Sequence, residues 1–122
     1  MKPKKTNYSQ SRCYAATLAA LKELKIDVEK ADSAKGLITT ERVEFYRAVE
    51  VVGSQYSAYG QTHTATHKYY LKISGSGNSS TVTVYRYRMW NNGIEQTKLN
   101  AKWCQANVWK PFFDTIGEKL SD

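Results

Sequence analysis

Tyrosine and arginine alternate in the run Tyr85-Arg86-Tyr87-Arg88, which is the best candidate for binding chemistry in this sequence. A guanidinium group forms strong paired hydrogen bonds with phosphate or carboxylate, and a tyrosine ring stacks on planar groups. Sheet proteins that bind RNA display both kinds of side chain on one open face. The competing interpretation, which we favour, makes Tyr85 and Tyr87 core residues and leaves Arg86 and Arg88 to solvate the outer face.

A block without acidic residues surrounds this run. The 122-residue chain has a net charge of +7, and no Asp or Glu occurs from Val51 to Ile94. Such a surface suits nucleic acid, anionic lipid headgroups or an acidic protein, and the alternative is a basic face that only aids solubility. The predicted binding residues are Lys68, Tyr70, Lys72, Arg86 and Arg88.

Histidine and cysteine are poorly spaced for metal binding or catalysis. His63 and His67 have the spacing of a zinc-protease helix but lack its Glu, and in an extended chain they stand roughly 13 Å apart, at about 3.3 Å per residue. Neither Cys13 nor Cys104 belongs to a C-x-x-C motif, and no serine lies in G-x-S-x-G. We therefore expect no catalytic residue, no metal site and no cofactor, and a protein that is not an enzyme.

The two cysteines lie near the starts of the two helices that the sequence predicts. If those helices pack side by side, a disulfide between Cys13 and Cys104 is geometrically feasible. The alternative is two buried free thiols.

The first half of the chain changes from a helical to a strand period. Helical spacing places Tyr14, Leu18, Leu21 and Leu24 on one face. Apolar and acidic residues then alternate over 26–29, turn-forming residues follow over 32–36, and a β-prone run covers 37–40. The sequence therefore predicts a helix packed against a β-hairpin.

Residues 41–53 fit either a strand or a short helix, and we favour a strand that ends near Phe45 because β-branched and aromatic residues are frequent there. Residues 54–66 are predicted to be a long polar loop, which is uncommon unless it is functional or mobile. Two strands follow, over 67–73 and 81–90, joined by a Gly- and Ser-rich hairpin. Neither face of the second strand is cleanly apolar.

The last element is a helix that begins near Trp109, because Pro111 is acceptable only in the first turn. We expect an α+β fold with an antiparallel sheet of about four strands, in the order α-β-β-β-β-α. Both helices pack on one face of that sheet and leave the other open. Residues 1–8 are expected to be a flexible basic tail, and 9–122 a single domain.

Two stretches resemble the small envelope lipoproteins of Gram-negative bacteria, including BamC-like domains. The helix-to-hairpin stretch over 14–21 and 26–40 ends in a Gly-apolar-Ile-Thr-Thr strand, and residues 109–116 resemble the C-terminal helix of those proteins. The clear match covers about a third of the chain. The resemblance implies a non-enzymatic α+β domain, held at a membrane by a lipid on an upstream Cys. Neither cysteine here lies in such a context, so the anchor would lie outside this chain.

The leading hypothesis is therefore a domain of the periplasm, or of the periplasmic face of the outer membrane. Its partner would be a protein or an anionic envelope component. The start of the chain, 1–5, is basic like the beginning of a signal peptide, but no apolar segment follows it. The alternative is a cytoplasmic nucleic-acid-binding module that uses the basic, aromatic sheet. The oligomeric state stays open.

Overall fold

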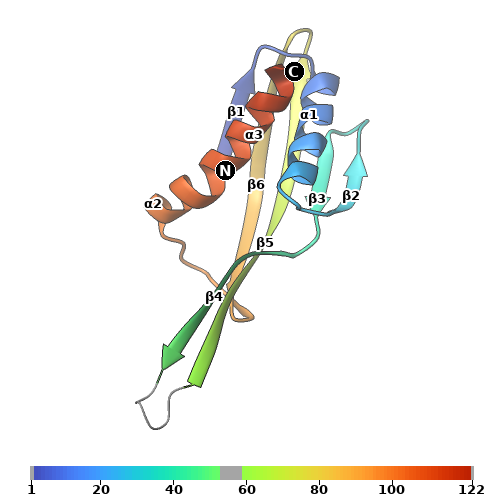
Figure 1. Cartoon of the computed structure of the whole chain (residues 1–122). Coiled ribbons are helices and arrows are strands. Elements are labelled where there is room, and N and C mark those ends of the chain that lie inside the picture. The colour runs from blue at the N-terminus through green and yellow to red at the C-terminus, as the bar shows by residue number, and fades with distance from the viewer. Residues whose placement is uncertain (1, 53–58, 122) are drawn as a thin grey trace.

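The computed structural model describes residues 2–52 and 59–121 (Figure 1). The chain forms one antiparallel sheet with helices on one side. The strands are β1 (Lys2–Thr6), β2 (Val28–Asp32), β3 (Leu37–Thr40), β4 (Val43–Val52), β5 (Tyr59–Ser76), β6 (Ser79–Asn91) and β7 (Ile94–Glu95). The helical segments are α1 (Gln10–Glu23), α2 (Ala101–Cys104), the π-helical η1 (Gln105–Trp109) and α3 (Lys110–Ser121).

The long strand β5 organises the sheet. The strand order is β1-β6-β5-β3-β2, with β4 also paired to β5 and β7 to β6. Strands β3 and β4 share one edge of β5, because β3 pairs with 70–72 and β4 with 59–67. Helices α1 and α3 pack together across one face. Strand β4 and the first part of β5 extend beyond these helices as a two-stranded arm (Figure 1).

The α+β fold is as predicted, but the predicted number and order of strands are wrong. The described residues form seven strands rather than about four, and a strand precedes α1. Part of the excess is β1, which lies in the stretch expected to be a flexible tail and pairs with residues 80–84 of β6. This strand has no apolar alternation to reveal it. Its ladder and the 2.7 Å hydrogen bond between the Thr6 and Ser80 hydroxyls hold it instead.

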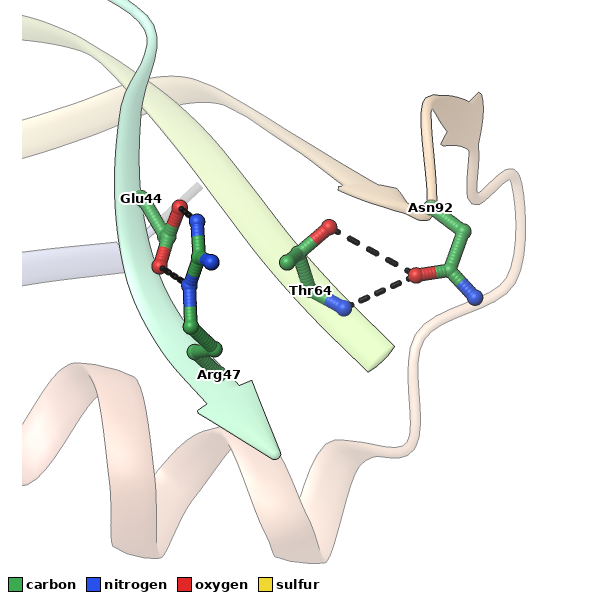
Figure 2. A network of polar contacts seen from close by, with 4 residues as sticks. All are labelled: Glu44, Arg47, Thr64 and Asn92. Carbon is green, nitrogen blue, oxygen red and sulfur yellow. Dashed lines mark hydrogen bonds and ion pairs between the residues drawn. The ribbon is translucent and has the colours of Figure 1, made fainter. Parts of the chain in front are cut away.

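The predicted loop over 54–66 is also largely wrong. Residues 59–66 belong to β5, and residues 53–58 lie outside the described part of the chain. Polar threonines at every second position from Thr62 to Thr66 are compatible with a strand because threonine is β-branched. The turn after β6 also contacts this part of β5. The Asn92 side chain accepts hydrogen bonds from the Thr64 amide at 2.8 Å and the Thr64 hydroxyl at 3.5 Å (Figure 2).

Strand β4 continues well past Phe45, where the sequence analysis ended it, and the helical alternative for this stretch is wrong. Phe45 is an extra residue in the ladder: Glu44 pairs with Thr66 and Tyr46 with Ala65, so Phe45 has no partner across the strand pair. Such a bulge bends a strand without ending it. Arg47 donates two hydrogen bonds, at 2.7 and 2.9 Å, to the Glu44 carboxylate and spans the bulge (Figure 2).

A second bulge explains the mixed faces of β6. Arg86 pairs with Tyr70 and Val84 with Leu71, so Tyr85 is extra. One extra residue exchanges the faces of everything that follows, because side chains alternate along a strand. Val82 and Val84 before the bulge, and Tyr87 and Met89 after it, therefore face the helices, while the arginines face outward. The favoured interpretation of the two tyrosines was half right, since only Tyr87 is a core residue.

The helical run at the C-terminus begins eight residues before the predicted start at Trp109. Pro111 lacks an N–H group and its ring crowds the preceding turn, which led the sequence analysis to place the helix start next to it. The π-helical segment η1 removes this conflict. The Lys110 amide donates to the Gln105 carbonyl five residues back, so the wider turn accommodates the proline ring. The predicted apolar stripe then lines the core through Phe112, Ile116 and Leu120.

Aromatic rings fill the core between the sheet and the helical run. Tyr69 is 1 % exposed and lies 4.8 Å from Phe112, 5.1 Å from Tyr87 and 4.8 Å from His67, measured between ring centroids. His67 is buried as well, and its Nδ1 lies 2.7 Å from the Tyr87 hydroxyl. Burial lowers the pKa of His67 to about 3, so its ring is neutral at physiological pH.

Cys13 and Cys104 are both buried in this core as free thiols, so the feasible disulfide is not formed. No helix among the described residues has the length and apolar character needed to cross a membrane.

Gly36 occupies a position that a side chain cannot share. It lies in the predicted turn with φ +67°, and a Cβ there would approach the Ile73 carbonyl oxygen to 2.1 Å. The Gly36 carbonyl also accepts a 2.7 Å hydrogen bond from the Ile73 amide. Gly77 has a similar φ of +59°, but open space surrounds it.

We expect Gly36→Ala to lower the free energy of unfolding by about 2–4 kcal/mol, because the left-handed conformation and the backbone clash both oppose a Cβ. Gly77→Ala should cost only about 1 kcal/mol, since it meets the first penalty alone. Urea denaturation of both variants measures the difference. Equal losses in the two variants would show that the contact with Ile73 is unimportant.

A second prediction follows from the neutral, buried His67. An unfolded histidine has a pKa near 6.5, so the unfolded state binds the additional proton and stability falls as the pH drops below that value. Lowering the pH from 7.5 to 5 should remove about 2 kcal/mol through this residue. The His67→Phe variant should lack that portion of the pH dependence. Urea denaturation at several pH values tests this prediction. If the free energy of unfolding depended on pH identically in the wild-type protein and the variant, the prediction would be contradicted.

Candidate binding face

The outer side of the β5–β6 pair, which no helix covers, carries the predicted binding residues. Lys68 pairs directly with Arg88 and Tyr70 with Arg86, and residues opposite each other in a ladder share a face. Lys72, two residues beyond Tyr70, is on the same side. We call this surface the basic face; it consists of Arg42, Lys68, Tyr70, Lys72, Tyr85, Arg86, Arg88 and Trp90.

All five predicted residues thus lie on one surface, and three residues outside the predicted set join them there. Tyr85 joins the basic face because it is the bulge residue; its ring is 6.2 Å from that of Tyr70. Trp90 also faces outward, because it pairs with Thr66, two residues before Lys68 on β5. Arg42 comes from the β3–β4 connection, and its Nε donates a 2.8 Å hydrogen bond to the Thr66 hydroxyl.

Each aromatic ring in the centre of the basic face lies close to two cations. The guanidinium groups of Arg42 and Arg88 are 4.1 and 4.7 Å from the Trp90 ring centroid. The Tyr70 ring has the Lys68 ammonium at 5.4 Å and the Arg86 guanidinium at 5.2 Å. Cation–π attraction of this kind orients long, flexible basic side chains. It also covers the rings: Trp90 is only 8 % exposed although it faces away from the core.

Two carboxylates hold two of these cations. The Lys68 ammonium is 2.6 Å from Glu29 on β2, and Arg88 forms a two-point ion pair with Glu95 on β7, at 2.6 and 3.2 Å. Hydrogen bonding to the cation lowers the pKa of each carboxyl group, Glu29 through Lys68 and Glu95 through Arg88. Exposed ion pairs add little to folding stability. Their effect here is to fix where the two cations lie.

Arg86 and Lys72 differ from Lys68 and Arg88, which each have a carboxylate partner. Within the described residues, no carboxylate forms an ion pair with either of them. The basic face therefore carries five cationic side chains against two carboxylates, a surplus of three positive charges. Arg86 and Lys72 are exposed and free to meet an incoming anion.

The structure shows no cluster of three or more metal-ligating side chains among the residues it describes. Both His63 and His67 belong to β5, and His67 is enclosed by aromatic rings in the core. What the basic face can do is electrostatic: it offers oriented guanidinium and ammonium groups to phosphate or carboxylate oxygens.

No family model matches this chain, and no curated protein matches it in sequence. Among solved structures, it is similar to the crystal structure of a DUF4468 family protein from Bacteroides ovatus. The two have 18 % sequence identity and a TM-score of 0.55, and the alignment covers 99 % of this chain and 85 % of the other. At that identity the likeness concerns the fold alone.

Proposed function

We propose that this protein is a non-catalytic binding domain of the cell envelope, and that its basic face binds an anionic envelope component. The observation that carries the proposal is the surplus of positive charge on an uncovered sheet face, with its cations held in place by rings and carboxylates. Side chains that are already oriented lose less conformational entropy when they bind a ligand.

The arrangement of the rings favours an anion over a nucleic-acid base. Base stacking requires an open aromatic face, and the centre of the basic face has cations over both of its rings, Tyr70 and Trp90. Tyr85 is the exception, because it is 45 % exposed and adjoins Arg86. It supports the second candidate, a nucleic-acid-binding module in which Tyr85 stacks on a base and the arginines contact phosphates.

The envelope location is supported by the resemblance of residues 14–40 and 109–116 to small envelope lipoproteins. In that setting the anionic component would be a phosphate-bearing headgroup or an acidic protein surface. We choose headgroup phosphate because Arg86 and Lys72 are exposed and have no ion-pair partner among the described residues, and such cations suit small anionic groups that are spread over a surface. An acidic protein is then an alternative that the same variants would reveal.

Vesicles containing phosphatidylglycerol test the basic face directly. The wild-type protein should co-sediment with vesicles of phosphatidylglycerol and phosphatidylcholine at low salt, and not with phosphatidylcholine alone. Lys72→Glu with Arg86→Glu should abolish the binding, because the surplus of three positive charges becomes a deficit of one.

The matched control is Lys22→Glu with Lys102→Glu, which changes the net charge equally on exposed helical positions. This control should retain most of the binding. Equal loss in both variants would indicate a nonspecific response to net charge and would contradict the proposal. Tighter binding to a single-stranded oligonucleotide, lost on Tyr85→Ala, would favour the nucleic-acid candidate instead.

Cell fractionation tests the location. Expressed from its full-length gene in its own host, the protein should be recovered with the periplasm or the outer membrane. The measurement is immunoblotting of separated fractions against cytosolic and periplasmic markers. Recovery in the cytosolic fraction alone would contradict the envelope location. It would not affect the proposal that the basic face binds anions, which the vesicle experiment tests independently.

A further inference from the structure

A cavity lies on the opposite side of the sheet from the basic face, where the helices end and the arm begins. Its volume is about 440 Å³, within the range of small-molecule sites. Leu24 and Ile26 after α1 form one wall, and Val108 and Phe112 of the helical run form another. The lining also includes Phe45, His67 and Tyr69 from the sheet.

His67 brings a polar atom to this mainly apolar space. Its Nδ1 is occupied by the Tyr87 hydroxyl, whereas its Nε2 makes no hydrogen bond within the part of the chain that the structure describes. Among those residues, no buried side-chain nitrogen or oxygen lacks a partner. Nε2 therefore has contact with open space, and the cavity is open space that His67 lines.

The position of the hydrogen atom in the bond between Tyr87 and His67 determines whether Nε2 is a hydrogen-bond donor or acceptor. Burial raises the pKa of Tyr87 and lowers that of His67, so both groups are neutral. The Tyr87 hydroxyl has His67 as its hydrogen-bond partner in the described structure, and it is satisfied as a donor only if Nδ1 accepts. A neutral imidazole that accepts at Nδ1 carries its hydrogen on Nε2. Nε2–H then faces the cavity as a donor.

The ring of Phe45 shapes the space next to this donor. It stacks on His67 with ring centroids 4.0 Å apart and planes inclined by 14°. Phe45 is the bulge residue of β4, so the same irregularity that extends the arm brings this ring over the histidine. At the rim, Arg47 is already held by Glu44 in the two-point ion pair of Figure 2. The lining is thus mostly aromatic and apolar around the His67 donor, and its charged and amide side chains are Lys25, Glu44, Arg47 and Asn107.

We propose that this cavity binds a small, neutral, largely apolar molecule whose hydrogen-bond acceptor, such as a ketone oxygen, receives the Nε2–H of His67. The site is separate from the basic face and does not depend on the proposed function. Uncharged aromatic or acyl compounds with one carbonyl group are the chemical class that fits the lining. A ligand of this class would occupy the apolar walls and satisfy the buried donor together.

Acetophenone and 2-phenylpropene are a suitable probe pair, because they have nearly the same shape and differ in a carbonyl oxygen that becomes a methylene group. Titration of protein with ¹⁵N-labelled histidine, followed by NMR, reports on the His67 ring directly. We expect the ring to carry its hydrogen on Nε2, and that nitrogen to shift on binding. Acetophenone should bind about threefold to tenfold more tightly than 2-phenylpropene, which is the usual worth of one hydrogen bond.

Two variants locate the site. Asn107→Trp places a large ring at an exposed position that lines the cavity, and it should block both probes. Its control, Gln105→Trp, changes an exposed neighbour outside the lining and should bind as wild type. The double variant His67→Phe with Tyr87→Phe removes both hydrogen-bonding partners at once, so it leaves none unpaired, and it should bind the two probes equally.

Several outcomes would overturn the inference. They are the absence of binding by either probe at saturating concentration, equal affinity of the wild-type protein for both probes, and unchanged binding in Asn107→Trp. Circular dichroism checks that each variant is folded. If the double variant does not fold, the wild-type titration and the Asn107→Trp comparison still decide the matter.

Discussion

The two-residue period of β-strands is the constraint on which the rest of this structure depends. A sheet covered by helices on one side requires each strand to send alternate residues to the core, and β6 cannot do so without a correction. Tyr85 supplies it. The single extra residue aligns Val82 and Val84 with Tyr87 and Met89 on the core side, and it sends the arginines outward. Without that bulge, either the arginines or the valines would be on the wrong face.

The bulge at Phe45 has a different effect. It lies near the start of β4, where Phe45 lines the same cavity as Val108 and Phe112. The rest of β4 continues into the arm. A bulge increases local twist, so the arm diverges from the helical layer and leaves space that side chains only partly fill. The cavity next to His67 is a consequence of that geometry. The π-helical turn at 105–109 borders the same space, because Val108 lies in its lining.

These features also explain which parts of the structure the sequence could predict. The α1 helix, the turn at Gly36 and the apolar stripe of α3 depend on local patterns, and each was predicted at nearly the right place. Strand β1 was missed because its stability comes from ladder bonds to β6, which leave no hydrophobic period in its own sequence. The bulges were missed for a related reason: only the paired strand reveals that a residue is extra. The five residues predicted to bind share one face because side chains alternate regularly along β5 and along β6 after the bulge, whereas Arg42 and Trp90 come together only through tertiary contacts.

The two candidate sites share one strand, and this limits how they can influence each other. His67 and Tyr69 of β5 point into the core, whereas Lys68 and Tyr70 point to the basic face. Neighbours in sequence therefore serve opposite surfaces, about one backbone thickness apart. Strand β5 is hydrogen-bonded on both edges, to β6 on one and to β3 and β4 on the other. It is therefore held rigidly when a ligand binds on either face. The cations of the basic face therefore keep their spacing whatever occupies the cavity. Coupling between the two sites would require movement of the arm, which extends beyond the helices.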